Sequence, residues 1–277
     1  MEQSIKKVWR VISPIVIYLV IERIVGFLVN FIYVWNQVNE TTVWTDELKN
    51  QLYLELYEMQ TENAVMISGL VAALCILIFY RTVRKEWLKR SYRIEVTEPK
   101  FLRYIYVGML SVGFTISVNL VINAWGLFKY NWDFAKVSQM IYSESLIMQI
   151  LVIGIIVPIC EELLFRGVVY ERVLQSGTAT SAMLISSILF AFFHGTWLQI
   201  VYAFAFSFLI IFAYQKCGNF SVAICFHIVS NLSALILRQL PVLSIMGYSI
   251  GIVGFALLGF AGLYLLKTHH FYEEIHI

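Results

Sequence analysis

Apolar stretches about twenty residues long recur along this chain, and they constrain its fold more than any other feature. A helix needs about 20 apolar residues to cross the hydrocarbon core of a bilayer. The 277 residues are 60% hydrophobic and only 14% charged, whereas a soluble domain carries roughly a quarter charged residues. The sequence therefore predicts an all-α, polytopic membrane protein.

We expect about eight transmembrane helices around a polar intramembrane cavity. Their approximate ranges are 11–34, 63–80, 102–125, 146–170, 178–195, 197–216, 219–238 and 244–266. The first stretch is too long for the core of a signal peptide, so we expect it to be retained as a span. Within one integral membrane domain, residues 1–144 hold N-terminal spans and loops, and residues 145–277 hold a core that carries the polar motifs.

The charges of the connections predict the orientation in a cell membrane. Lys and Arg gather before the first span and in the connection 81–100, whereas the segment between the first two spans is acidic. Short loops rich in Lys and Arg stay in the cytoplasm, so an even number of spans places both termini there. The connection 81–100 is either a basic loop or an interfacial helix on anionic lipid. The net charge of +2 and the lack of a basic stripe give no indication of nucleic-acid binding.

Glu161, Glu162 and Arg166 lie within the fourth predicted span. Ionisable residues in a span are costly and indicate a functional site. Residues four apart share a helix face, so Glu162 is expected to pair with Arg166. Glu161 points about 100° away and is expected to face the cavity, where a carboxylate can act as a general base.

Two later spans add His194, His227 and Asn231 to this half of the chain. His227 and Asn231 are one helical turn apart and share a face. A carboxylate, two imidazoles and an amide donor are the groups that peptide hydrolysis by an activated water requires. No Gly-x-Ser-x-Gly nucleophile motif accompanies them.

These residues form three motifs in order: Glu161-Glu162-x-x-x-Arg166, Phe190-x-x-x-His194 and His227-x-x-x-Asn231. Over about residues 145–235, the chain resembles the CAAX protease and bacteriocin-processing family of intramembrane glutamate endopeptidases, related to the type II CAAX prenyl protease. The resemblance implies a cavity open to the cytoplasm and no cofactor. It also implies that Glu161 activates water, His194 orients it, His227 and Asn231 line an oxyanion hole, and Glu162 and Arg166 support the site.

Other functions remain open at this stage. Glu161, His194 and His227 are one carboxylate and two imidazoles, a set that can bind zinc, although no His-Glu-x-x-His motif is present. The same fold also suits a non-catalytic membrane scaffold, an immunity factor or a signalling regulator. A proton-coupled transporter is disfavoured because the sequence shows no repeated halves.

The expected partners are the lipid bilayer and a membrane-associated peptide or lipidated protein substrate. A prenylated C-terminus, a bacteriocin leader and a pheromone precursor all fit that description. The position of His194 raises a geometric question, because it lies about 24 Å into its span when counted from residue 178. That span must tilt, start late or break at Gly195.

Overall fold

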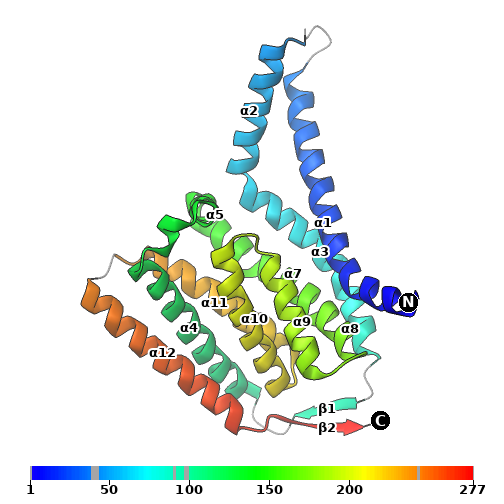
Figure 1. Ribbon diagram of the computed structural model, residues 1–277, viewed down its shortest axis with the longest axis vertical. Helices are drawn as coiled ribbons and strands as arrows, with labels where there is room; N and C mark the ends of the chain where they lie inside the picture. Colours follow the sequence, from blue (N-terminus) through cyan, green and yellow to red (C-terminus); the bar gives the residue numbers. More distant parts are fainter. Residues whose placement is uncertain (1, 39–43, 90–91, 97–99, 242–243, 277) are drawn as a thin grey trace.

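The computed structural model describes residues 2–38, 44–89, 92–96, 100–241 and 244–276, and it confirms an all-α, polytopic membrane fold (Figure 1). Within these residues, seven helices are long and apolar enough to cross a membrane. They are α1 (Glu2–Gln37), α3 (Ala64–Trp87), α4 (Lys100–Ala124), a continuous helix over Leu146–Leu174, α10 (Trp197–Cys217), α11 (Phe220–Gln239) and α12 (Ile245–Thr268).

The predicted span 178–195 is a shorter helix, so the expectation of a full-length span there was wrong. Helix α9 (Ala179–Phe192) has 14 residues, about 21 Å at 1.5 Å per residue. It begins with a capping box in which Thr178 and Ser181 satisfy each other's backbone N–H groups. It ends just before Gly195, whose φ of 78° a residue with a side chain rarely adopts. Because α9 packs along α10, the chain still reverses direction at this point.

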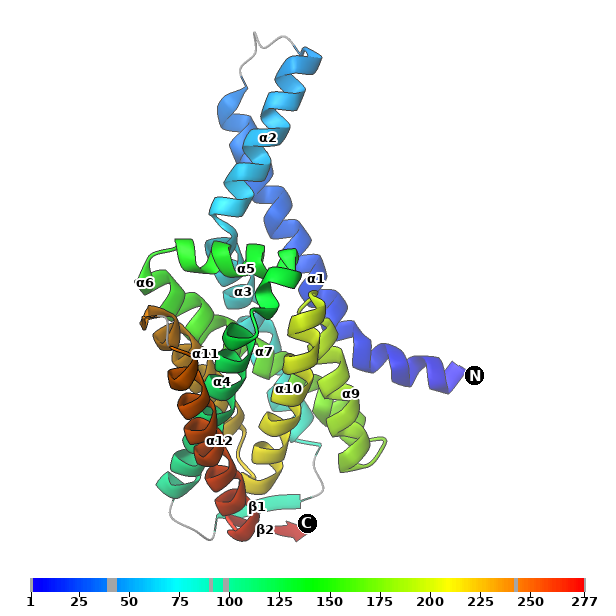
Figure 2. The same ribbon diagram turned by 60° about the vertical axis from the view of Figure 1, so that its left-hand side comes forward.

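The acidic segment between the first two spans forms a helix of its own. Helix α2 (Asp46–Glu62) starts at Thr45, whose hydroxyl accepts a hydrogen bond from the Leu48 N–H. Helices α1 and α2 extend together beyond one end of the bundle (Figures 1 and 2). At the same end, η1 (Leu127–Tyr130) and α5 (Trp132–Ser143) lie across the bundle.

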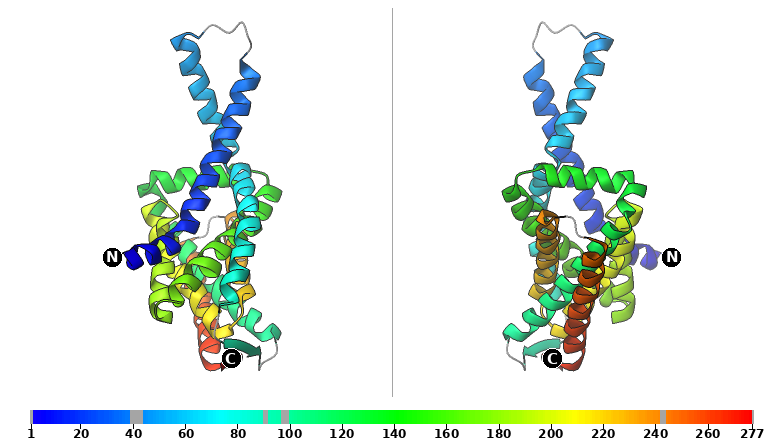
Figure 3. Two further views of the ribbon diagram at one scale, coloured as in Figure 1. Left: turned by 90° about the vertical axis from the view of Figure 1, so that its right-hand side faces the viewer. Right: turned by 90° about the vertical axis from the view of Figure 1, so that its left-hand side faces the viewer.

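A two-stranded antiparallel ribbon lies at the opposite end of the molecule from the α1–α2 tip (Figure 3). Strand β1 (Tyr92–Val96) pairs with β2 (Tyr272–His276), so that Tyr92 lies opposite His276. The described part of the connection 81–100 is thus the end of α3 and a strand, and the alternative of an interfacial helix was wrong. The pairing also places the C-terminal segment beside the basic connection.

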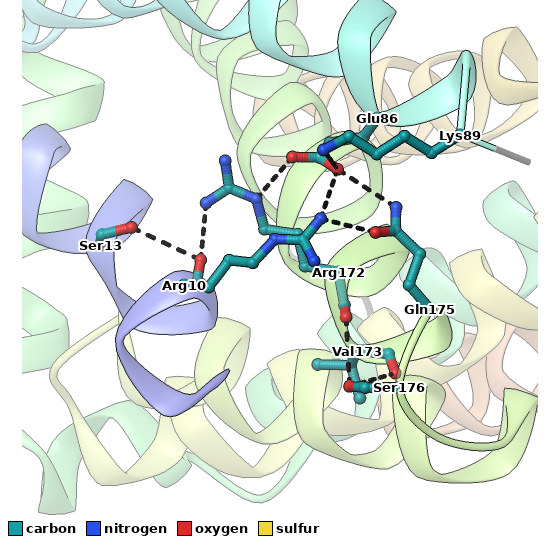
Figure 4. A network of polar contacts seen from close by, with 8 residues as sticks. All are labelled: Arg10, Ser13, Glu86, Lys89, Arg172, Val173, Gln175 and Ser176. Carbon is teal, nitrogen blue, oxygen red and sulfur yellow. Dashed lines mark hydrogen bonds and ion pairs between the residues drawn. The ribbon is translucent and has the colours of Figure 1, made fainter. Parts of the chain in front are cut away.

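A charged network fixes the first span against the others (Figure 4). Glu86 of α3 is only 3% exposed and accepts hydrogen bonds from Arg10, Lys89 and Arg172, each at 2.9 Å. Gln175 donates to the same carboxylate at 3.2 Å. Three cations around one buried carboxylate therefore join α1, α3 and the end of the helix Leu146–Leu174.

Helices α4 and α12 approach each other closely through glycines. A Cβ atom added at Gly113 would lie 2.3 Å from the backbone nitrogen of Gly259, and one at Gly262 would lie 2.6 Å from the nitrogen of Leu110. Small residues let helix backbones meet in this way inside membranes. This contact positions α4, against which α11 and its His227 pack.

Candidate active site

A helix with two widened turns carries the paired carboxylates. Its parts are α6 (Leu146–Met148), the π-helix η2 (Gln149–Ile156), α7 (Val157–Glu162), the π-helix η3 (Leu163–Tyr170) and α8 (Glu171–Leu174). In a π turn each N–H bonds the carbonyl five residues back, as Val157 does with Val152. Such turns are frequent at functional sites, and here they flank Glu161 and Glu162.

Asn231 of α11 satisfies a carbonyl that the first widened turn leaves free. The residue five positions after Ile153 is Pro158, which has no N–H to donate. The Asn231 side-chain amide donates to the Ile153 carbonyl at 2.8 Å instead. An unsatisfied carbonyl inside a membrane costs several kcal/mol, so Asn231 stabilises the turn that precedes Glu161.

Glu162, Arg166 and His227 form a buried polar cluster. One oxygen of Glu162 accepts from Arg166 Nη1 at 2.9 Å and from His227 Nδ1 at 2.7 Å. The side chains of Glu162 and Arg166 are fully buried. The predicted pairing of Glu162 with Arg166 is thus present, and it extends to an imidazole on another helix. Because a carboxylate only accepts, Nδ1 of His227 carries the proton and Nε2 is free to act elsewhere.

Arg166 also binds groups on α9 and α10. Its second terminal nitrogen donates to the Ser207 hydroxyl at 2.9 Å, and that hydroxyl donates to Ser187 at 3.1 Å. The guanidinium carbon lies 4.4 Å from the centre of the Phe190 ring, within the range of a cation–π interaction. Arg166 therefore holds three helices in register around the carboxylates.

Glu161 lies in a different environment from Glu162, as its helical position predicted. Its side chain is 13% exposed and one of its oxygens lies 3.6 Å from Nε2 of His227. It lines a pocket of about 480 Å³ together with His194. Of the two adjacent carboxylates, one is a buried support and the other is open to the pocket.

His194 reaches this pocket from the end of α9. Its Nδ1 lies 2.9 Å from the Phe190 carbonyl, which can only accept, so Nδ1 donates. In the neutral imidazole, Nε2 is then an acceptor for a proton of water or substrate. The break at Gly195 resolves the question of depth, because α9 ends beside the pocket that Glu161 lines.

The structure thus brings Glu161, Glu162, Arg166 and His227 into one cluster, with His194 on the pocket that Glu161 shares. Asn231 is bonded through its amide to a backbone carbonyl. The sequence analysis missed Tyr18 and Glu22 of α1, which line the pocket, and Ser187 and Ser207, which support Arg166. Glu22 could have been found by its charge within an apolar span, whereas serines give no such signal.

Among the residues that the structure describes, no group of three His, Cys, Asp or Glu side chains is arranged to hold a metal ion. Glu161 and His227 are close to each other, but His227 Nδ1 is already bound to Glu162. The arrangement gives no geometric support for the zinc alternative.

The fold and the site define a multi-pass membrane protein with a carboxylate–imidazole centre inside its bundle. Residues 143–233 match the family model described as type II CAAX prenyl endopeptidase Rce1-like. This match confirms the resemblance inferred from the three motifs, and it is consistent with the CAAX protease and bacteriocin-processing family. It supports a membrane protease in general.

Three curated relatives show the same likeness. "Putative membrane peptidase YdiL" of Bacillus subtilis (strain 168) is 24% identical over 179 residues, which cover 64% of this chain and 72% of the relative. "Uncharacterized protein YpbD" of the same strain is 24% identical over 61% of this chain and 82% of its own length. "UPF0177 protein YxdF" of Lactococcus lactis subsp. lactis (strain IL1403) is 35% identical over 34% of this chain and 52% of its own length. No solved structure gives a significant match.

Proposed function

We propose that this protein is an intramembrane endopeptidase in which Glu161 activates a water molecule. The observation that carries the proposal is the different placement of two adjacent carboxylates. Glu162 is buried against Arg166 and His227, whereas Glu161 faces the pocket beside His194. A general base needs access to water and substrate, and its support needs neither.

In the proposed reaction, Glu161 takes a proton from water while the water oxygen attacks the scissile carbonyl. His194 orients this water through its Nε2. The proton passes from Glu161 to the leaving amine as the tetrahedral intermediate collapses, which regenerates the carboxylate. No covalent enzyme intermediate is required.

His227 is placed to stabilise the oxyanion of the tetrahedral intermediate. Glu162 binds its Nδ1 and so favours the protonated ring, whose Nε2–H then donates toward the pocket. The second amide hydrogen of Asn231 is a further candidate donor, because only one is used at Ile153. Glu162 and Arg166 act by holding His227 and the helix that carries Glu161.

The proposed substrate is a membrane-associated peptide or lipidated protein, cleaved toward the cytoplasmic side. Apolar side chains of Leu19, Leu189 and Phe192 line the pocket beside Glu161, which suits a hydrophobic segment. The maturation of a bacteriocin or another exported peptide is one role of this kind. By the distribution of Lys and Arg, the charged network around Glu86 lies at the cytoplasmic end of the bundle.

The test is single-turnover cleavage of membrane-embedded peptides by purified protein. Glu161→Gln preserves the shape of the side chain but removes the base, and we expect a loss of about 10²–10⁴-fold in rate. Glu47→Gln, on the exposed outer helix α2, is the matched control and should cleave as the wild type does. Cleavage by Glu161→Gln at the wild-type rate would reject the proposal.

Two further arms separate the alternatives. Loss of cleavage after treatment with a chelator, with recovery on adding zinc, would support a zinc enzyme. Full activity of Glu161→Ala in the producing cell would indicate a scaffold or regulator that does not use the site.

A further inference from the structure

Glu22 of α1 lines the pocket that holds Glu161 and His194, and the proposed reaction does not use it. It lies in an apolar helix that is long enough to span the membrane. Charged residues at such positions are costly and tend to face a polar cavity or a partner. Here the cavity is the candidate active site, so the first span contributes directly to it.

Glu22 and Glu161 lie at matching depths. Arg172 Nη1 donates to the Arg10 carbonyl at 2.6 Å, which fixes α1 beside α8 (Figure 4). From this contact, Glu22 lies about 18 Å along α1, and Glu161 lies a similar distance back along its own helix, at 1.5 Å per residue. The charges of both carboxylates act on the Tyr18 phenol, so they share one space.

The charge of Glu22 is the one in this pocket that lacks a balancing cation among the described residues. Glu161 has His227 beside it, whereas the structure shows no ion pair or hydrogen bond for Glu22 within the ranges it describes. The neighbouring Arg23 points to a different face, because adjacent helix residues do not face each other. It lines a separate groove on α1 with Val20 and Phe27.

We propose that Glu22 is a specificity residue that binds a cationic side chain, lysine or arginine, of the substrate. This inference rests on the proposed function, since it concerns the substrate of the same pocket. The apolar wall formed by Leu19, Leu189 and Phe192 binds the hydrophobic part of the peptide. The preferred substrate is then a hydrophobic segment with a basic residue close to the scissile bond.

The test is a binding measurement with two fluorescent hydrophobic peptides that differ at one central position. One peptide carries lysine, and the other carries norleucine, which keeps the alkyl chain but lacks the ammonium group. In uncharged detergent, the wild type should bind the lysine peptide about tenfold more tightly, the effect of one charge-assisted hydrogen bond. Glu22→Gln should remove this preference without weakening the norleucine peptide.

Arg23→Gln is the matched control, because it changes the neighbouring charge on the other face of α1, and it should keep the preference. Equal affinity of the wild type for both peptides, including no binding of either, would overturn the proposal. A preference that persists in Glu22→Gln would do the same. Because the readout is binding, a retained preference without Glu161-dependent cleavage would reject the peptidase and leave the cation site standing.

Discussion

At the scale of single residues, Asn231 combines a structural contact with a candidate catalytic one. Its amide donates to the Ile153 carbonyl, which Pro158 leaves without a backbone donor. The same amide has a second hydrogen for an oxyanion. A loss of rate in Asn231→Ala would therefore combine two effects, and they can be separated by restoring the backbone donor.

We expect Asn231→Ala to lower stability by about 1–3 kcal/mol, because it leaves a buried carbonyl unsatisfied. Pro158→Ala in the same background supplies an N–H five residues after Ile153 and should recover most of this loss. Thermal unfolding in detergent measures both steps. Asn119→Ala is the control, since the Asn119 amide bonds a carbonyl of its own helix, that of Thr115.

If stability recovers in the double variant while single-turnover cleavage stays slow, Asn231 also acts on the oxyanion. If both recover, its role is to hold the turn that carries Glu161. No recovery of stability would contradict our account of the Ile153 carbonyl.

The sequence predicted the local pairs of the site better than the contacts between helices. Helical spacing was enough to pair Glu162 with Arg166 and to separate Glu161 from them. The bonds of His227 to Glu162 and of Ser207 to Arg166 join residues far apart in the chain, and spacing within one helix carries no information about them. Glu22 lay in a predicted span, but only the fold shows that its face meets Glu161.

At the scale of helices, the contact between α4 and α12 depends on the absence of side chains. In Gly113→Ala, the new Cβ would lie 2.3 Å from the backbone of Gly259, so the two helices must separate. We expect a loss of stability of about 1–3 kcal/mol, as for other overpacked sites. Detergent gel filtration after graded heating measures it.

Gly108→Ala is the control on the same helix, because nothing lies within 4 Å of its added Cβ. Alanine favours a helix over glycine by about 0.5–1 kcal/mol, so this variant should be at least as stable as the wild type. Equal melting of the two variants would show that the helices tolerate separation at Gly113.

Hydropathy located the spans but not their irregularities. The length of α9 is set by Gly195, and the widened turn in η2 precedes Pro158; both are local breaks inside apolar stretches that read as uniform. The ribbon of β1 and β2 joins two polar segments from distant parts of the chain. No pattern within either segment indicates its partner.

At the scale of the whole molecule, the short helix α9 leaves the predicted topology open to a direct test. In a background without native cysteines, Thr45→Cys and Thr268→Cys should be labelled from opposite sides of the membrane. Ser176→Cys, just before α9, should be labelled from the same side as Thr268→Cys, because both lie at the network-and-ribbon end of the bundle. A membrane-impermeant maleimide on intact and opened cells gives the readout.

Labelling of Thr45→Cys and Thr268→Cys from one side would contradict the arrangement of spans. Labelling of Ser176→Cys with Thr45→Cys would instead place the start of α9 at the wrong end. Each outcome identifies the part of the topology that fails.

The pairing of β1 with β2 has a consequence for biogenesis. Strand β1 leaves the ribosome early, but its partner is among the last residues to be synthesised. The ribbon can therefore close only after every span has been made and inserted. Until then, the unpaired edge of β1 is a site where a nascent chain can associate wrongly, and closure of the ribbon marks the end of assembly.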